Sequence, residues 1–125
     1  MPNHLHLIIS AVNNNLSDII RDFKKFTSAK VLKAIEENSR ESRRNWMLWI
    51  FKKAGENNNR ITNYQFWQQD NNPVACTTEE ILQTRINYLH ENYVRAGFVY
   101  RAADYRYISP KDYYTTGEGL LKITR

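Results

Sequence analysis

The first apolar stretch of the chain is short and ends at a turn. It runs from Leu5 to about Val12, and three consecutive asparagines, Asn13 to Asn15, follow it. Asparagine favours turns because its side chain bonds to the nearby backbone. A short apolar run bounded by turn residues is typical of a buried strand. The pattern therefore predicts a strand over residues 5–12.

Two amphipathic helices are predicted after this strand. Asn15 or Ser17 can cap the first helix, Asp18 suits its first turn, and it extends to about Glu37. Its apolar positions recur every three or four residues: Ile19, Ile20, Phe23, Phe26, Thr27, Val31 and Ala34. Ser39 is expected to cap a second helix that ends near Ala54. In that helix the same spacing is found for Trp46, Trp49, Ile50 and Lys53.

The sequence pattern of the second half of the chain predicts a short strand, a third helix and a tail. Residues 55–60 are predicted to form a loop. Aromatic and amide side chains alternate over residues 64–69, which favours a strand. Residues 70–73 are expected to end that strand. Thr77 and Glu80 form a capping box, and Gly97 is a typical helix stop, so a helix is expected between them. Residues 98–125 are expected to be weakly structured, with one short helix near Pro110.

The third helix has two different faces. One stripe is mainly apolar and is expected to be buried: Leu82, Ile86, Leu89, Tyr93 and Ala96. The neighbouring stripe is mainly polar: Ile81, Arg85, Tyr88, Asn92 and Arg95. Because Tyr88 lies one turn before Asn92, a phenol and an amide oxygen stand side by side, with an arginine a turn away on either side. Such a face suits phosphate binding and chemistry, although a tyrosine at the edge of a core would show the same spacing.

The composition is that of a single soluble domain. The 125 residues are 42% hydrophobic and 25% charged. Cys76 is the only cysteine, which excludes a disulfide framework and favours a reducing interior. The longest strongly apolar run, residues 47–51, is far shorter than the roughly 20 residues of a membrane span. We therefore expect no membrane partner and a cytoplasmic location.

Positive charge is concentrated in one part of the chain. Residues 21–60 contain eleven lysines and arginines against five acidic residues, whereas residues 61–125 contain seven of each. A basic region that also holds aromatic side chains suits a phosphate backbone, although a solvated helix face has the same composition.

Two histidines in the predicted first strand form a candidate metal site. His4 and His6 are two residues apart, so on a strand both rings would leave the same face. Paired imidazoles suit a divalent metal and leave coordination positions open. The spacing alone fits a pair of structural histidines equally well.

Three segments together resemble the HUH-type single-tyrosine transposases. Residues 1–9, Met-Pro-Asn-His-Leu-His-Leu-Ile-Ile, resemble the metal-binding strand of that family. Residues 88–99, which start at Tyr88 and contain Asn92, Arg95 and Gly97, resemble the tyrosine helix of the branch associated with repetitive extragenic palindromes. Residues 66–68, Phe-Trp-Gln, are similar to another segment of that branch. One departure is Tyr93, where that branch has proline, which should let the helix continue for another turn.

The resemblance implies an α+β fold. The expected architecture is a partial ferredoxin-like HUH fold over residues 1–99, an antiparallel sheet with helices on one face, followed by the tail of residues 100–125. The family's first strand, helix and strand would be missing before His4. Three explanations stay open: a start at an internal methionine of a longer protein, a truncated remnant, or a homodimer that pairs its His strands across subunits and so covers the exposed edges.

The resemblance also implies a reaction. Tyr88 would attack a phosphodiester of hairpin-bearing single-stranded DNA, leaving a 5′-phosphotyrosine link and a free 3′-hydroxyl. His4, His6 and Asn92 would bind Mg²⁺ or Mn²⁺, which polarises a phosphate oxygen. Basic side chains would hold the DNA in a bacterial, nucleoid-associated setting: Arg21, Lys24, Lys25, Arg43, Arg44, Arg85 and Arg95. The alternative is a catalytically inactive remnant that still binds DNA.

Overall fold

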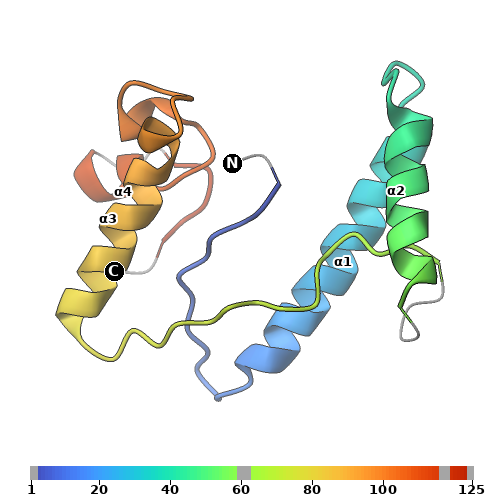
Figure 1. Cartoon of the computed structure of the whole chain (residues 1–125). Helices are drawn as coiled ribbons and strands as arrows, with labels where there is room; N and C mark the ends of the chain where they lie inside the picture. The colour runs from blue at the N-terminus through green and yellow to red at the C-terminus, as the bar shows by residue number, and fades with distance from the viewer. Residues whose placement is uncertain (1–2, 59–62, 116–118, 124–125) are drawn as a thin grey trace. The chain divides into compact units, whose positions relative to one another are not determined.

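The computed structural model describes residues 3–58, 63–115 and 119–123. Its elements are α1 (Leu16–Glu37), α2 (Arg44–Glu56), α3 (Glu79–Arg95), the 3₁₀ helix η1 (Ala102–Asp104) and α4 (Pro110–Tyr114), as Figure 1 shows. They belong to two compact units. Unit 1 consists of residues 1–9 and 74–125, and unit 2 consists of residues 10–73.

The predicted α+β fold with an antiparallel sheet is wrong, because the described residues are helical and contain no β-strand. The segment predicted as a buried strand is exposed: Leu5 and Leu7 keep 49% and 48% of their surface, and Ile8 and Ile9 keep 41% and 43%. The backbone of residues 3–9 makes no hydrogen bond to the backbone of another described residue. A strand needs a partner for its N–H and C=O groups, and this sequence pattern carries no information on whether one exists.

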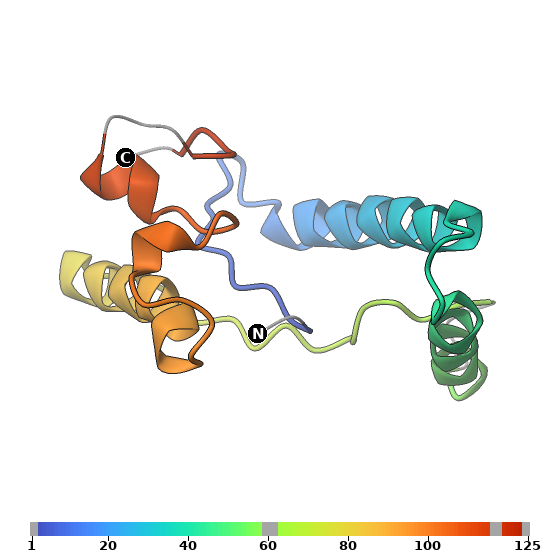
Figure 2. The same cartoon turned by 90° about the horizontal axis from the view of Figure 1, so that it is seen from above.

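Unit 2 is built on the predicted pair of helices. Helices α1 and α2 are in contact, and Figures 1 and 2 show α2 next to the C-terminal end of α1. Helix α1 starts after Asn15, whose carbonyl accepts from the N–H groups of Asp18 and Ile19, and Asp18 lies in the first turn as predicted. No side chain caps this helix, so its start depends on the backbone turn alone.

Helix α2 starts later than predicted. Its N-cap residue is Arg43, not Ser39, and the helix ends at Glu56. Residues 38–43 form turns instead, in which the Glu41 carboxylate accepts from both the backbone N–H and the Nε of Arg43. A side chain that bonds its own backbone competes with the helix in this way.

The second predicted strand, residues 64–69, is an irregular segment that packs on the helices of unit 2. The Gln65 N–H donates to the Phe51 carbonyl at 2.9 Å, and the Phe66 ring lies 5.1 Å from that of Phe51. The Trp67 Nε1–H donates to Thr27 Oγ1 on α1 at 2.9 Å. The alternation of aromatic and amide residues thus reflects contacts with helices and not a sheet face.

Gly55 makes this packing possible. It is buried in α2, and a Cβ built on it would lie 2.7 Å from the carbonyl oxygen of Asn63. A carbon atom and a carbonyl oxygen do not approach that closely, so only glycine allows the segment to pass here.

Unit 1 contains α3, η1 and α4. The N-cap of α3 is Thr78, whose hydroxyl accepts from the Ile81 N–H, one residue after the predicted cap at Thr77. The predicted stop at Gly97 is confirmed: its φ is +74°, and the Phe98 N–H donates to the Tyr93 carbonyl. This is a Schellman motif, and the Phe98 ring contacts the Tyr93 ring as the motif favours.

The centre of unit 1 is small and partly polar. Ile86 and His90, one turn apart on α3, are 5% and 3% exposed, and Pro110 and Asp112 of α4 are buried with them. The Tyr93 ring stacks on that of Tyr105 at 3.7 Å. A short helix near Pro110 was predicted and is confirmed, whereas the burial of His90 was not predicted.

No helix of the described residues is long and apolar enough to cross a membrane.

Candidate functional site

The two histidines of the sequence motif lie side by side in unit 1. The His4 and His6 rings are 4.8 Å apart and nearly perpendicular. They therefore meet without a sheet, because an extended segment places alternate side chains on one side even when no strand pairs with it.

Helix α3 brings a tyrosine and an amide to the same histidine. Asn92 Nδ2 lies 3.1 Å from His6 Nε2, although the two residues are 86 positions apart in the sequence. The Tyr88 ring lies 5.9 Å from the His6 ring, edge to face. Tyr88 is 46% exposed. His4, His6, Tyr88 and Asn92 thus form one cluster at the surface of unit 1, which we call the His–Tyr cluster.

Hydrogen bonds identify which ring nitrogens are available. An amide nitrogen only donates, so in this contact the Asn92 amide donates to His6 Nε2. His4 Nδ1 lies 2.9 Å from the side-chain oxygen of Asn3, which only accepts, so Nδ1 is the donor in this contact. Burial lowers the pKa of His6, and the nearby His4 lowers it further. A neutral imidazole is the form that binds metals, and a metal on His6 Nε2 would have to displace the Asn92 amide from it.

These residues fit a divalent cation. The candidate donors are the imidazoles of His4 and His6 and the amide oxygen of Asn92. The Asn92 atom that contacts His6 is the nitrogen, so the amide would have to turn over for its oxygen to join them. The carbonyl partner of His4 Nδ1 supplies the outer hydrogen bond that typically orients a histidine ligand. The described residues hold no group of three His, Cys, Asp or Glu side chains suited to a metal.

Two arginines flank the His–Tyr cluster on the same helix. Arg85 and Arg95 are exposed, one turn before Tyr88 and about one turn after Asn92, and neither forms an ion pair with a described residue. Guanidinium groups without a carboxylate partner are suited to phosphate oxygens. The polar stripe of α3 therefore presents an unpaired positive charge on each side of the tyrosine.

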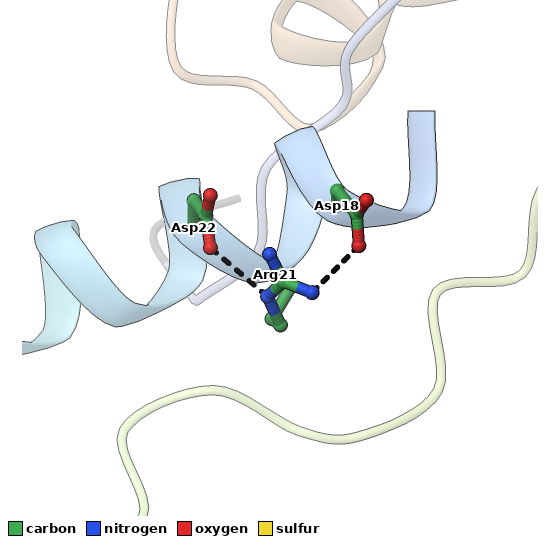
Figure 3. A network of polar contacts seen from close by, with 3 residues as sticks. All are labelled: Asp18, Arg21 and Asp22. Atoms are coloured by element: carbon green, nitrogen blue, oxygen red, sulfur yellow. Dashed lines mark hydrogen bonds and ion pairs between the residues drawn. The ribbon is translucent and has the colours of Figure 1, made fainter. Parts of the chain in front are cut away.

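The remaining predicted DNA-binding residues lie in unit 2, and two of them are neutralised by carboxylates. Figure 3 shows Arg21 between Asp18 and Asp22, with nitrogen–oxygen distances of 2.6 and 2.9 Å, and both acids raise the pKa of its guanidinium. Arg43 pairs with Glu41 at 3.1 Å. A phosphate must compete with these acids, so Arg21 and Arg43 are weaker candidates for DNA binding than the number of basic residues in this region suggested.

Lys24, Lys25 and Arg44 differ from these two. Lys24 donates to the carbonyl of Gln68 at 2.7 Å, and Arg44 lies 3.5 Å from the carbonyl of Glu36. Lys25 forms no ion pair with any residue described. None of the three is neutralised by an acid, so each retains its positive charge for a phosphate.

Sequence reasoning missed two residues of this region. Asn3 orients His4, and it stands in the Met-Pro-Asn lead of the motif, so its position beside a predicted ligand was the available signal. His90 lies on α3 between Tyr88 and Asn92, yet it faces α4: its Nε2 contacts the Ser109 hydroxyl at 3.2 Å. Its Nδ1 is buried without a hydrogen-bond partner among the described residues, and burial lowers its pKa. The i, i+4 spacing from Ile86 was the signal for its burial.

No protein-family model, curated protein or solved structure matches this chain.

Proposed function

We propose that the chain is a metal-dependent, single-tyrosine DNA strand transferase of the HUH type. The observation that carries the proposal is the contact between His6 and Asn92 at 3.1 Å, with Tyr88 beside it. It joins the two segments that resemble the transposase family, and those segments are distant in sequence. A chance pair of histidines and a chance tyrosine helix would have no reason to meet.

The proposed reaction is a transesterification on single-stranded DNA. Tyr88 Oη attacks a phosphorus atom, a bond forms between them, and the bond from phosphorus to the 3′-oxygen breaks. The tyrosine proton ends on that 3′-oxygen, so the products are a 5′-phosphotyrosine link and a 3′-hydroxyl. Attack by another 3′-hydroxyl reverses the step and joins the strands.

Each of these residues of unit 1 has a separate role in the proposed reaction. Tyr88 supplies the nucleophile, and its exposure allows the phosphate of a polymer to reach it. Arg85 and Arg95 hold phosphates on either side of the attacked one. His4, His6 and Asn92 would hold Mg²⁺ or Mn²⁺, which when bound polarises a phosphate oxygen and makes the phosphorus a better electrophile. A phenol needs such help because its ordinary pKa of about 10 leaves it protonated at neutral pH.

The proposal includes the partners and the setting implied by the resemblance. The substrate is hairpin-bearing single-stranded DNA, and two copies of the chain pair through residues 5–9, whose apolar side chains and backbone are exposed. The exposed free thiol of Cys76 suits the reducing bacterial cytoplasm, where nucleoid DNA lies.

The second candidate is an inactive remnant that binds DNA without cleaving it. The observation that favours it is the absence of a sheet behind the His segment in the described residues, because metal sites need ligands held rigidly. Tyr88 and Asn92 lie on a regular helix, so the His segment is the part on which the two candidates differ.

A covalent-adduct assay separates the two candidates. The protein is mixed with 3′-labelled oligonucleotides that carry a hairpin and randomised flanks, in the presence of Mn²⁺, and is run on a denaturing gel. We expect a labelled protein band that chelation abolishes, that Tyr88→Phe abolishes and that Tyr100→Phe leaves unchanged, since Tyr100 is equally a surface tyrosine at 99% exposure. An adduct that survives Tyr88→Phe refutes the assignment of the nucleophile. Oligonucleotide binding without any adduct identifies the inactive remnant.

A further inference from the structure

Helix α2 has an outward face that consists largely of tryptophan. Trp46 and Trp49 are each 58% exposed, and Ile50 beside them is 36% exposed. The side of α2 that packs within unit 2 is formed by other residues, which are less exposed: Met47, Leu48, Phe51, Ala54 and Gly55. The repeat of Trp46, Trp49, Ile50 and Lys53 in the sequence therefore marks the solvent side of the helix.

The two indoles are available for contacts. Neither makes a hydrogen bond or a ring contact with another described residue, in contrast to Trp67, which donates to Thr27 and lies 6.0 Å from the Phe23 ring. Side chains three residues apart on a helix have Cβ atoms about 5–6 Å apart. Trp46 and Trp49 thus present two open aromatic surfaces next to each other, which we call the tryptophan pair.

The surroundings of the tryptophan pair are basic. Within residues 40–56 there are five basic and two acidic residues, and both acids are engaged: Glu41 with Arg43 and Glu56 with Lys53. Arg40 and Lys52 form no ion pair with a described residue. Exposed aromatic rings in a field of positive charge suit a partner that has both flat rings and phosphates.

The exposed area of the tryptophan pair is too small for a stable interface with a second copy of the chain. A tryptophan side chain buries at most about 250 Å², so two rings at 58% exposure offer roughly 300 Å². A stable protein interface needs about 800 Å² from each partner. Stacked bases need only the rings themselves.

We infer that the tryptophan pair binds unpaired bases of single-stranded DNA by stacking, with the basic side chains of α2 and the preceding turn contacting the phosphates. This site uses no residue of the His–Tyr cluster and needs no metal, whereas the choice of DNA as the nucleic acid rests on the proposed function. It selects single strands, because paired bases in a duplex have no free face to offer.

Tryptophan fluorescence and oligonucleotide affinity test the inference. Oligo(dT) of about 15 nucleotides is titrated into the full chain without added metal, and emission and anisotropy are both followed. We expect quenching, a dissociation constant that rises steeply between about 50 and 200 mM salt, and weak binding of a duplex of equal length. Trp46→Leu and Trp49→Leu should each weaken binding about tenfold, since stacking on one aromatic ring contributes roughly fivefold to a hundredfold.

Matched variants make the result specific. Trp46→Phe and Trp49→Phe keep a ring and should retain most of the affinity, whereas Tyr100→Leu removes a still more exposed ring in unit 1, 99% exposed, and should change it less than twofold. Helix content by circular dichroism should be equal in all variants, because these side chains are largely exposed.

Four outcomes overturn the inference: equal loss in Tyr100→Leu, preference for the duplex, tighter binding of an RNA strand than of oligo(dT), or no quenching together with a dimer that Trp46→Leu dissociates. The adduct assay on Tyr88 is unaffected by any of them. Failure of the tryptophan pair and failure of the proposed chemistry are therefore distinguishable.

Discussion

Replacing Gly55 by alanine should destabilise unit 2, although alanine is the better helix former. Helix propensity favours alanine over glycine by at most about 1 kcal/mol at this position near the end of α2. Against this, the new Cβ would lie 2.7 Å from the Asn63 carbonyl oxygen and 3.3 Å from the Gln65 nitrogen. Both obstacles are backbone atoms, so no side-chain rotation relieves the overlap.

The steric cost of the added Cβ should exceed the gain in helix propensity. Forcing an extra carbon into a packed site costs about 1–3 kcal/mol, and the segment cannot retreat without lengthening the 2.9 Å bond from the Gln65 N–H to the Phe51 carbonyl. The difference is a net loss of about 1 kcal/mol. For a unit of this size it corresponds to a fall in melting temperature of roughly 5 °C.

Fluorescence measures this loss in unit 2 alone. All three tryptophans of the chain lie between residues 10 and 73, so thermal unfolding followed by tryptophan emission reports on unit 2. Lys52→Gly and Lys52→Ala, at an exposed position of the same helix, measure the propensity term separately and should differ by about 1 kcal/mol in favour of alanine. A melting temperature that rises in Gly55→Ala would refute the steric reasoning.

Three further predictions concern single side chains. Burial holds the pKa of His90 below its ordinary value of about 6.5. The contribution of neutral His90 to the stability of unit 1 should therefore be complete above that pH and be lost as the pH falls below it. Hydrogen exchange of α3 should accelerate on acidification, and the acceleration should be smaller in His90→Leu. Trp67→Phe removes the hydrogen bond to Thr27 and should cost unit 2 about 1 kcal/mol in urea unfolding, whereas an unchanged midpoint would mean that water replaces the bond. Asn92→Asp replaces the amide by a carboxylate and should tighten Mn²⁺ binding in a calorimetric titration; weaker binding would remove Asn92 from the ligand set.

Local signals predicted the helices and could not predict the absence of a sheet. The apolar spacing of residues 17–37 and the stop at Gly97 depend only on neighbours in the sequence, and both gave the correct element. A strand at residues 5–12 depends on a partner elsewhere, so the same apolar run is compatible with a buried strand and with the exposed segment that is present. The cap of α2 failed for a third reason, since Glu41 bonds to Arg43 and so competes with the helix.

The candidate site was partly predictable for a similar reason. Tyr88 and Asn92 share a helix face at a fixed spacing, and His4 and His6 share one side of an extended segment, so each pair is a local property. That the two pairs meet is not local, and only the family resemblance indicated it. The role of Asn3 and the outward direction of the tryptophan pair depend on tertiary packing, which the apolar spacing does not specify.

The division of unit 1 between the two ends of the chain has a consequence during synthesis. His6 leaves the ribosome 86 residues before Asn92, which at about 5–20 residues per second is a delay on the order of 4–17 s. Unit 2 is continuous in sequence and is synthesised completely within that interval, so it can fold first. A folded unit 2 then stands between the two parts of unit 1 in place of a long flexible loop. This lowers the entropy that is lost when the two parts of unit 1 come together. His6 has no Asn92 to contact until the end of that interval, so slowing translation between residues 74 and 92 should lengthen the time before unit 1 can form.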